Sequence, residues 1–293
     1  MTADQLLKEG RLDEALKSLQ TAVRDEPASA KLRIFLFQLL SIVGDWKRAL
    51  TQLHVLADMD SDSMMLARVF EPVLRCEAFR NDVFAGKRTP IIFGQPPEWI
   101  GYLIQAMEYF GKNEFHAGIE QRNKAFDVAP ASSGKINGQW FEWIADADER
   151  LGPLLEVILD GKYYWVPFCR IKQIVMQPVS DLRDLVWTPA QFVWENGGEA
   201  FGHIPSRYPG SEIEADSKLR LAKKTEWRET NGIQIGLGQR LLATDADEYP
   251  LLEIRTVEIT PITSASPVPE VSPPAVVSGP PDISRPAEIS SDI

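Results

Sequence analysis

Cysteine and histidine are scarce: this chain of 293 residues contains two cysteines and three histidines. Cys76 and Cys169 lie far apart and form no CxxC motif, so neither a disulfide framework nor a dithiol redox site is expected. No two histidines are three or four residues apart, which excludes a zinc site built on an HxxxH helix. The sequence therefore lacks the usual patterns by which these two residue types carry chemistry.

Long apolar runs and an excess of positive charge are also missing. The apolar stretch over residues 34–43 is interrupted by Gln38 and Ser41 and is far shorter than the roughly 20 residues that span a bilayer. No basic leader precedes an apolar run at the N-terminus, so no secretory signal is expected. The net charge is −11, and no basic stripe could follow a phosphate backbone. The sequence predicts a cytoplasmic protein that neither inserts into membranes nor binds nucleic acid.

Carboxylates gather densely only at Asp146, Asp148 and Glu149, with Arg150 beside them. Their oxygens are of the type that Mg²⁺ or Ca²⁺ prefers. However, no glycine-containing loop of a calcium site follows, and the arginine would compete for the same carboxylates. A structural ion pair or a solvated turn is the favoured interpretation. We expect no catalytic residue, no metal and no cofactor, and the chain is predicted not to be an enzyme.

What the sequence does contain is an internal repeat of 34 residues. The pattern Gly-x-x-x-x-Ala-Leu-x-x-Leu occurs at residues 10–19 and again at residues 44–53. This period is typical of tetratricopeptide helix–turn–helix units, which stack and bind proteins. Gly10 and Gly44 suit the turn between two helices, where a positive φ is often needed. A third helix pair, either a degenerate repeat or a cap, is expected from Trp99 to a stop at Pro130.

Composition divides the chain into three parts. Residues 1–130 show apolar residues at helical spacing, which predicts an α-helical tetratricopeptide-like domain. In residues 131–259 short apolar runs alternate with turn signals such as Asp160-Gly161, which predicts a small β-rich domain. Residues 260–293 hold eight prolines, seven serines and no aromatic residue, which predicts a disordered tail, with proline-rich partner binding as a second option. The expected fold class is α+β.

Aromatic residues beside a rigid loop offer a candidate partner-binding site. Prolines and a glycine crowd residues 89–99, with Phe93 inside this loop and Trp99 and Tyr102 just after it. Such residues can anchor a partner side chain. The alternative, which we favour for Trp99, is that its ring packs the loop onto the helices.

Four blocks of residues carry a family resemblance. They are residues 75–90 with 93–94 and 96–99; 146–153 with Glu156 and 161–167; 178–187; and 238–240 with 244–245 and 250–253. In these blocks, which are spread over much of residues 75–253, the chain resembles the ImpE/TagJ family of accessory components of bacterial type VI secretion systems. The proline-rich tail departs from the common pattern of that family.

The resemblance implies a non-enzymatic cytoplasmic adaptor. Its expected partner is the small subunit of the contractile sheath, bound through an amphipathic segment near that subunit's N-terminus. A connection to the AAA+ ATPase that disassembles the sheath is also implied. Stacked helix pairs present a concave groove that suits a partner helix, and the few repeats present here predict a short one.

Two other functions remain open at this point. One is a general tetratricopeptide peptide-binding scaffold; such modules usually hold acidic tails with Lys and Arg, and residues 1–130 carry a net charge of only −2. The other is a metal-dependent hydrolase in the C-terminal domain that uses Asp146, Asp148 and Glu149.

Overall fold

The computed structural model describes residues 1–261, which belong to one compact unit. The predicted disordered tail lies outside the described residues from residue 262 onward. Apart from the two-residue strand Ile91–Ile92, helices come first in the described part and strands dominate after them, so the predicted α+β class is confirmed. The change occurs after residue 128, close to the predicted boundary at residue 130. Independent folding of residues 1–130 and 131–259 stays a prediction.

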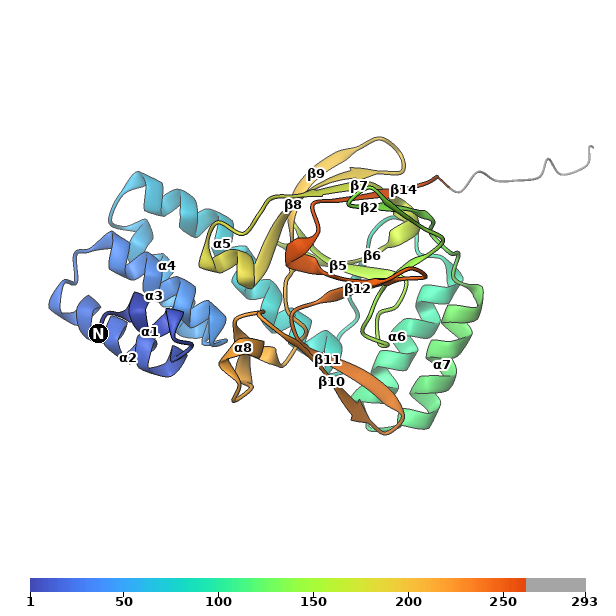
Figure 1. The fold of residues 1–293 in the computed structure, drawn as a ribbon, viewed down its shortest axis with the longest axis horizontal. Helices are drawn as coiled ribbons and strands as arrows, with labels where there is room; N and C mark the ends of the chain where they lie inside the picture. The colour runs from blue at the N-terminus through green and yellow to red at the C-terminus, as the bar shows by residue number, and fades with distance from the viewer. Residues whose placement is uncertain (262–293) are drawn as a thin grey trace, which may run out of the picture. The chain divides into compact units, whose positions relative to one another are not determined.

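The helical part is a succession of paired helices (Figure 1). Its helices are α1 (Ala3–Lys8), α2 (Leu12–Asp25), α3 (Ala30–Ile42), α4 (Trp46–Ala57), α5 (Ser61–Phe84), α6 (Glu98–Gly111) and α7 (Phe115–Val128). Ala15 and Ala49, the small residues of the predicted repeat, are both fully buried. They let neighbouring helices approach closely, as the repeat pattern predicts. The long helix α5 bridges both parts of the fold, because Phe70 contacts Phe37 of α3 and Phe79 contacts Tyr163 of the sheet.

Polar side chains cap several helix starts, where the first backbone N–H groups have no partner within the helix. Thr2 and Gln5 form a capping box at α1. Asp45 accepts a hydrogen bond from the backbone of Arg48, and Asp60 does the same for Ser63. These local signals explain why α1, α4 and α5 begin where they do.

Gly10 and Gly44 have φ angles of 76° and 71°, so the predicted positive φ is confirmed at both turns. A Cβ at Gly10 would meet no atom within 4 Å, so Gly10→Ala tests backbone strain alone. We expect this variant to lower the free energy of unfolding by about 1 kcal/mol. The matched control is Gly101→Ala within α6, which has open space and helical φ and should raise stability by about 0.5–1 kcal/mol. Equal shifts in chemical denaturation for both variants would contradict this account.

The strand-rich part contains a nine-stranded sheet in the order β1-β6-β5-β9-β8-β7-β14-β2-β3. Its strands are β1 (Ile91–Ile92), β2 (Gly134–Ile136), β3 (Gln139–Phe141), β5 (Leu154–Leu159), β6 (Lys162–Pro167), β7 (Ile171–Met176), β8 (Trp187–Trp194), β9 (Glu199–Pro205) and β14 (Thr256–Ile259). The hairpin predicted at Asp160-Gly161 is confirmed as β5–β6, and both turn residues have positive φ.

Two smaller sheets and several short helices complete the described part. Strands β10 (Thr225–Thr230) and β11 (Ile233–Gly238) form a hairpin, and β4 (Ile144–Asp146), β12 (Leu241–Thr244) and β13 (Glu248–Pro250) form a three-stranded sheet. The short helices are α8 (Ser217–Arg220) and the 3-10 helices η1 (Phe168–Arg170), η2 (Leu182–Leu185), η3 (Ser211–Ile213) and η4 (Leu251–Glu253). No helix in residues 1–261 is both long and apolar enough to cross a bilayer.

Strand β5 separates two hydrophobic cores and is buried along its whole length. Leu154 and Ile158 belong to the core shared with the helices, whereas Leu155 and Val157 belong to the core within the strand-rich part. Glu156 lies on the helix side, between two apolar neighbours on that face, and is fully buried. A carboxylate at this place needs partners, because an unpaired buried charge costs several kcal/mol.

Candidate partner-binding site

The three aromatic residues predicted to bind a partner do not form one surface. Phe93 packs against Trp194, with ring centroids 4.1 Å apart, and it joins the core of the strand-rich part. Trp99 is only 5% exposed and lies in the core shared with the helices. Tyr102 is half-buried, and its hydroxyl contacts Glu98. The packing alternative thus describes Trp99, and partner binding by these three residues stays a prediction.

The groove expected along the first helices is occupied by the chain's own residues where α3 and α5 face the sheet. Gln38 of α3 donates a hydrogen bond to Asp181 across 3.0 Å. The ring of Trp187 lies 6.1 Å from Trp46 and 5.8 Å from the ring of Phe70. The expectation of an open groove there is wrong, because the segment around β8 already buries this apolar face.

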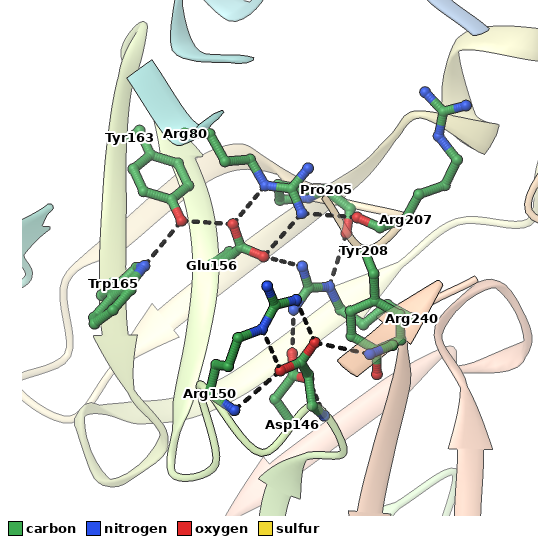
Figure 2. A network of polar contacts seen from close by, with 12 residues as sticks. Arg80, Asp146, Arg150, Glu156, Tyr163, Trp165, Pro205, Arg207, Tyr208 and Arg240 are labelled. Carbon is green, nitrogen blue, oxygen red and sulfur yellow. Dashed lines mark hydrogen bonds and ion pairs between the residues drawn. The ribbon is translucent and has the colours of Figure 1, made fainter. Parts of the chain in front are cut away.

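A network of buried charges lies where α5, β4, β5 and the start of β12 meet (Figure 2). Glu156 accepts hydrogen bonds from Arg80 Nε at 2.5 Å and Nη2 at 2.9 Å. It also accepts from the Tyr163 hydroxyl at 2.5 Å and from Arg240. The indole N–H of Trp165 in turn donates to the Tyr163 oxygen at 2.8 Å. One carboxylate therefore joins the long helix to the sheet.

Arg240 connects this carboxylate to the three-stranded sheet. The side chain is fully buried, pairs with both Asp146 and Glu156, and donates through Nε to the carbonyl of Pro205 at 2.9 Å. Asp148 forms the adjoining pair, accepting from Arg150 Nε at 2.8 Å and Nη2 at 2.6 Å. The ion-pair interpretation of these aspartates is thereby confirmed. In residues 1–261, no group of three His, Cys, Asp or Glu side chains is placed to hold a metal ion.

The two carboxylates that contact Arg240 have opposite pKa shifts. Burial alone would raise the pKa of Glu156, but the positive charges of Arg80 and Arg240 outweigh it and hold this pKa at about 2. Burial raises the pKa of Asp146 to about 7, because its desolvation outweighs the attraction of Arg240. The network therefore responds to pH in two separate ranges.

An open groove of about 400 Å³ lies on the other face of β4. Its floor includes Ala145 and Ala243, which are opposite each other on β4 and β12. Phe126 of α7 and Trp143 form its walls, and they are 38% and 40% exposed. Small residues on the floor and aromatic rings on the sides leave room for apolar side chains of a ligand. We call this the alanine-floored groove.

The two sites are the two faces of one segment, residues 143–150. Every even-numbered residue from 144 to 150 is buried, whereas every odd-numbered one is at least partly exposed. Side chains of an extended strand alternate in this way over β4, and the alternation of burial continues through the bend and turn of residues 147–150. Asp146 and Asp148 therefore point into the ion network, and Trp143 and Ala145 line the groove. The sequence analysis interpreted the carboxylates of this segment correctly as ion-paired, but it did not predict the groove on the side of Trp143 and Ala145.

Comparison with known proteins gives the family. Residues 138–258 match the family described as ImpE protein, and residues 6–68 match the tetratricopeptide repeat. The type VI secretion system accessory component TagJ of Pseudomonas aeruginosa is 44% identical over 261 residues. This alignment covers 89% of the present chain and 92% of that protein. The chain belongs to the ImpE/TagJ family. The residues that match the ImpE family include strand β4, Glu156 and Arg240.

A solved structure shows the same fold. The crystal structure of a protein from Vibrio parahaemolyticus superimposes with a TM-score of 0.81 and is 24% identical in sequence. It covers 88% of this chain and 97% of its own. The arrangement of helices and sheets described above is thus shared with a distant protein.

Proposed function

We propose that this protein is a non-enzymatic adaptor of a bacterial type VI secretion system that binds the small subunit of the contractile sheath. The observation that carries the proposal is the 44% identity, over 89% of the chain, to a protein named as an accessory component of such a system. The tetratricopeptide match over residues 6–68 supports a protein-binding role, since stacked repeats of this kind present binding surfaces. The proposed role is cytoplasmic.

The side chains considered for catalysis support an adaptor rather than a hydrolase. Asp146 and Asp148 each pair with an arginine, and Glu149 pairs with Arg122 across 2.6 Å. Carboxylates held in this way are engaged in structure and are not aimed at a common substrate position. We further propose that binding to the sheath subunit connects the sheath to the AAA+ ATPase that disassembles it.

A titration of the full chain with the purified sheath small subunit tests the proposal. We expect calorimetry to show saturable binding with a defined stoichiometry. We also expect this binding to be lost when the N-terminal segment of the subunit is removed. A disordered or helical segment of this kind can supply most of the contacts of such an interface. Absence of binding to the intact subunit would reject the proposal, and unchanged binding to the truncated subunit would reject the N-terminal segment as the ligand.

A further inference from the structure

We propose that the alanine-floored groove is the docking site for a basic amphipathic helix of the protein partner. The inference rests on the proposed adaptor function and adds the surface and the chemistry that recognises the partner. It follows from three properties of the groove: exposed aromatic walls, a border rich in carboxylates and a rigid construction.

The walls of the groove expose apolar surface, although Gly152 and Arg122 cover part of the ring of Phe126. Phe126 and Trp143 line the cavity and are 38% and 40% exposed. Contiguous apolar surface of this kind marks interaction sites in soluble proteins, and tryptophan is among the residues that contribute most to binding energy. A cavity of about 400 Å³ has room for two aliphatic side chains one helical turn apart on a partner helix.

The groove is bordered mainly by negative charge. Glu149 lines the groove, and the exposed acids Asp127 and Glu142 are the sequence neighbours of its wall residues Phe126 and Trp143. The exposed Asp245 accepts hydrogen bonds from the backbone N–H groups of Glu142 and Trp143, at 2.7 and 3.4 Å, which places a further carboxylate at the same edge.

Two cations of α7 precede Phe126, namely Arg122 and the exposed Lys124, and the charge of Arg122 is already matched. Arg122 pairs with Glu149 and lies over the ring of Phe126, 5.8 Å from the centroid. Residues 131–258 carry a net charge of −6, so the surroundings have the same sign as the border. A partner with Lys or Arg beside its apolar stripe is therefore complementary to this site, and an acidic one is repelled.

The construction of the groove is rigid, which lowers the entropic cost of binding. The ring of Phe126 lies over Gly152, where a Cβ would come within 2.3 Å of it, and Gly152 has a φ of 52°. Behind the floor, the buried charges of Asp146 and Asp148 hold the strand in place. The close contact between the ring of Phe126 and Gly152 fixes this wall of the groove before a partner binds, so binding needs no rearrangement of the wall.

The test uses the full-length protein and two probes. One probe is the sheath small subunit; the other is a fluorescein-labelled amphipathic peptide of Leu and Lys, compared with its Leu and Glu counterpart. The groove variants are Trp143→Ala and the pair Asp127→Lys with Glu142→Lys.

Phe201→Ala is the matched aromatic control, since Phe201 is 75% exposed on β9 outside the groove. The pair Glu195→Lys with Glu199→Lys, both exposed near the turn between β8 and β9 and outside residues 6–68, is the control of equal charge change.

We expect both groove variants to weaken binding of the Leu–Lys peptide and of the sheath subunit at least about tenfold. Both controls should bind like the unaltered protein, and the Leu–Glu peptide should bind at least about tenfold more weakly than the Leu–Lys peptide. The charge reversals remain informative should Trp143→Ala fail to fold. Asp127 lies in the last turn of α7, where a lysine suits the helix dipole.

Distinct results separate the two proposals. Binding of the sheath subunit that is indifferent to the groove variants would overturn the inference and leave the adaptor function standing. Groove-dependent binding of the Leu–Lys peptide without any binding of the sheath subunit would support the groove chemistry and reject the proposed partner. Equal losses in the groove variants and the controls, or equal affinity for the two peptides, would show nonspecific attraction and overturn the inference.

Discussion

Replacing Arg240 by methionine is expected to lower the free energy of unfolding by about 3–5 kcal/mol, or to prevent folding altogether. The guanidinium is fully buried and is paired with both Asp146 and Glu156. Methionine fills similar space but leaves two carboxylates without this partner in a region that excludes water. Chemical denaturation followed by circular dichroism measures the loss.

The matched control for this variant is Arg170→Met. Arg170 forms an ion pair with Glu195 at 3.1 Å, and both side chains are more than 40% exposed. Exposed pairs of this kind contribute at most about 1 kcal/mol. A loss at Arg240 no larger than the loss at Arg170 would show that the ion pairs of Arg240 do not stabilise the contact between β4 and β5.

Acidification from pH 5 to pH 2 is expected to remove about 3 kcal/mol of stability through Glu156 alone. Its pKa is lowered from 4.5 to about 2 in the folded protein. A carboxyl with a lowered folded pKa stabilises fully above its unfolded pKa, and this contribution is lost as the pH falls toward the folded value. The contribution is therefore present at pH 5 and above and declines below about pH 4.5.

Asp146 has the opposite effect on the pH dependence of the free energy of unfolding, and this effect lies at higher pH. Its folded pKa is raised from 3.8 to about 7, so between these values the folded state binds more protons than the unfolded state. Stability from this group therefore rises as the pH falls from 7 to about 4. Together the two carboxyls place the stability maximum of the network near pH 4–5.

Denaturation midpoints measured from pH 8 to pH 2 check both effects. Glu156→Gln should flatten the acidic side of the profile, and Asp146→Asn should flatten the side between pH 4 and pH 7. These differences in slope remain measurable even though each variant is less stable than the unaltered protein. A profile that is level between pH 7 and pH 4, or that keeps rising below pH 4, would contradict the assignment of the two pKa shifts.

The helical part was predictable because its signals are local. The repeat of 34 residues located the turns at Gly10 and Gly44, and both have the positive φ that favours glycine. The turn at Asp160-Gly161 was likewise recognised from two adjacent residues and the apolar runs beside it. In each case the responsible contacts lie within a few residues along the chain.

The buried network was not predictable in the same way. Arg240 and Asp146 are 94 residues apart, and Arg80 and Glu156 are 76 apart. Nothing near these residues in the sequence indicates which carboxylate will meet which arginine. A single glutamate within the apolar run of residues 154–159 was the available signal of a buried charge, and we interpreted that run only as a strand.

The sequence by itself determined the α+β class, the helix pairs, the hairpin turns and the family, because periodicity, turn residues and order of blocks are properties of neighbouring positions. Only the tertiary structure decided that the segment around Trp187 covers the helical face expected to be open, and that residues 143–150 separate an ion network from a groove. The physical reason is that burial depends on which distant segments meet. An apolar helix face can be buried equally well by a partner protein or by another segment of the same chain.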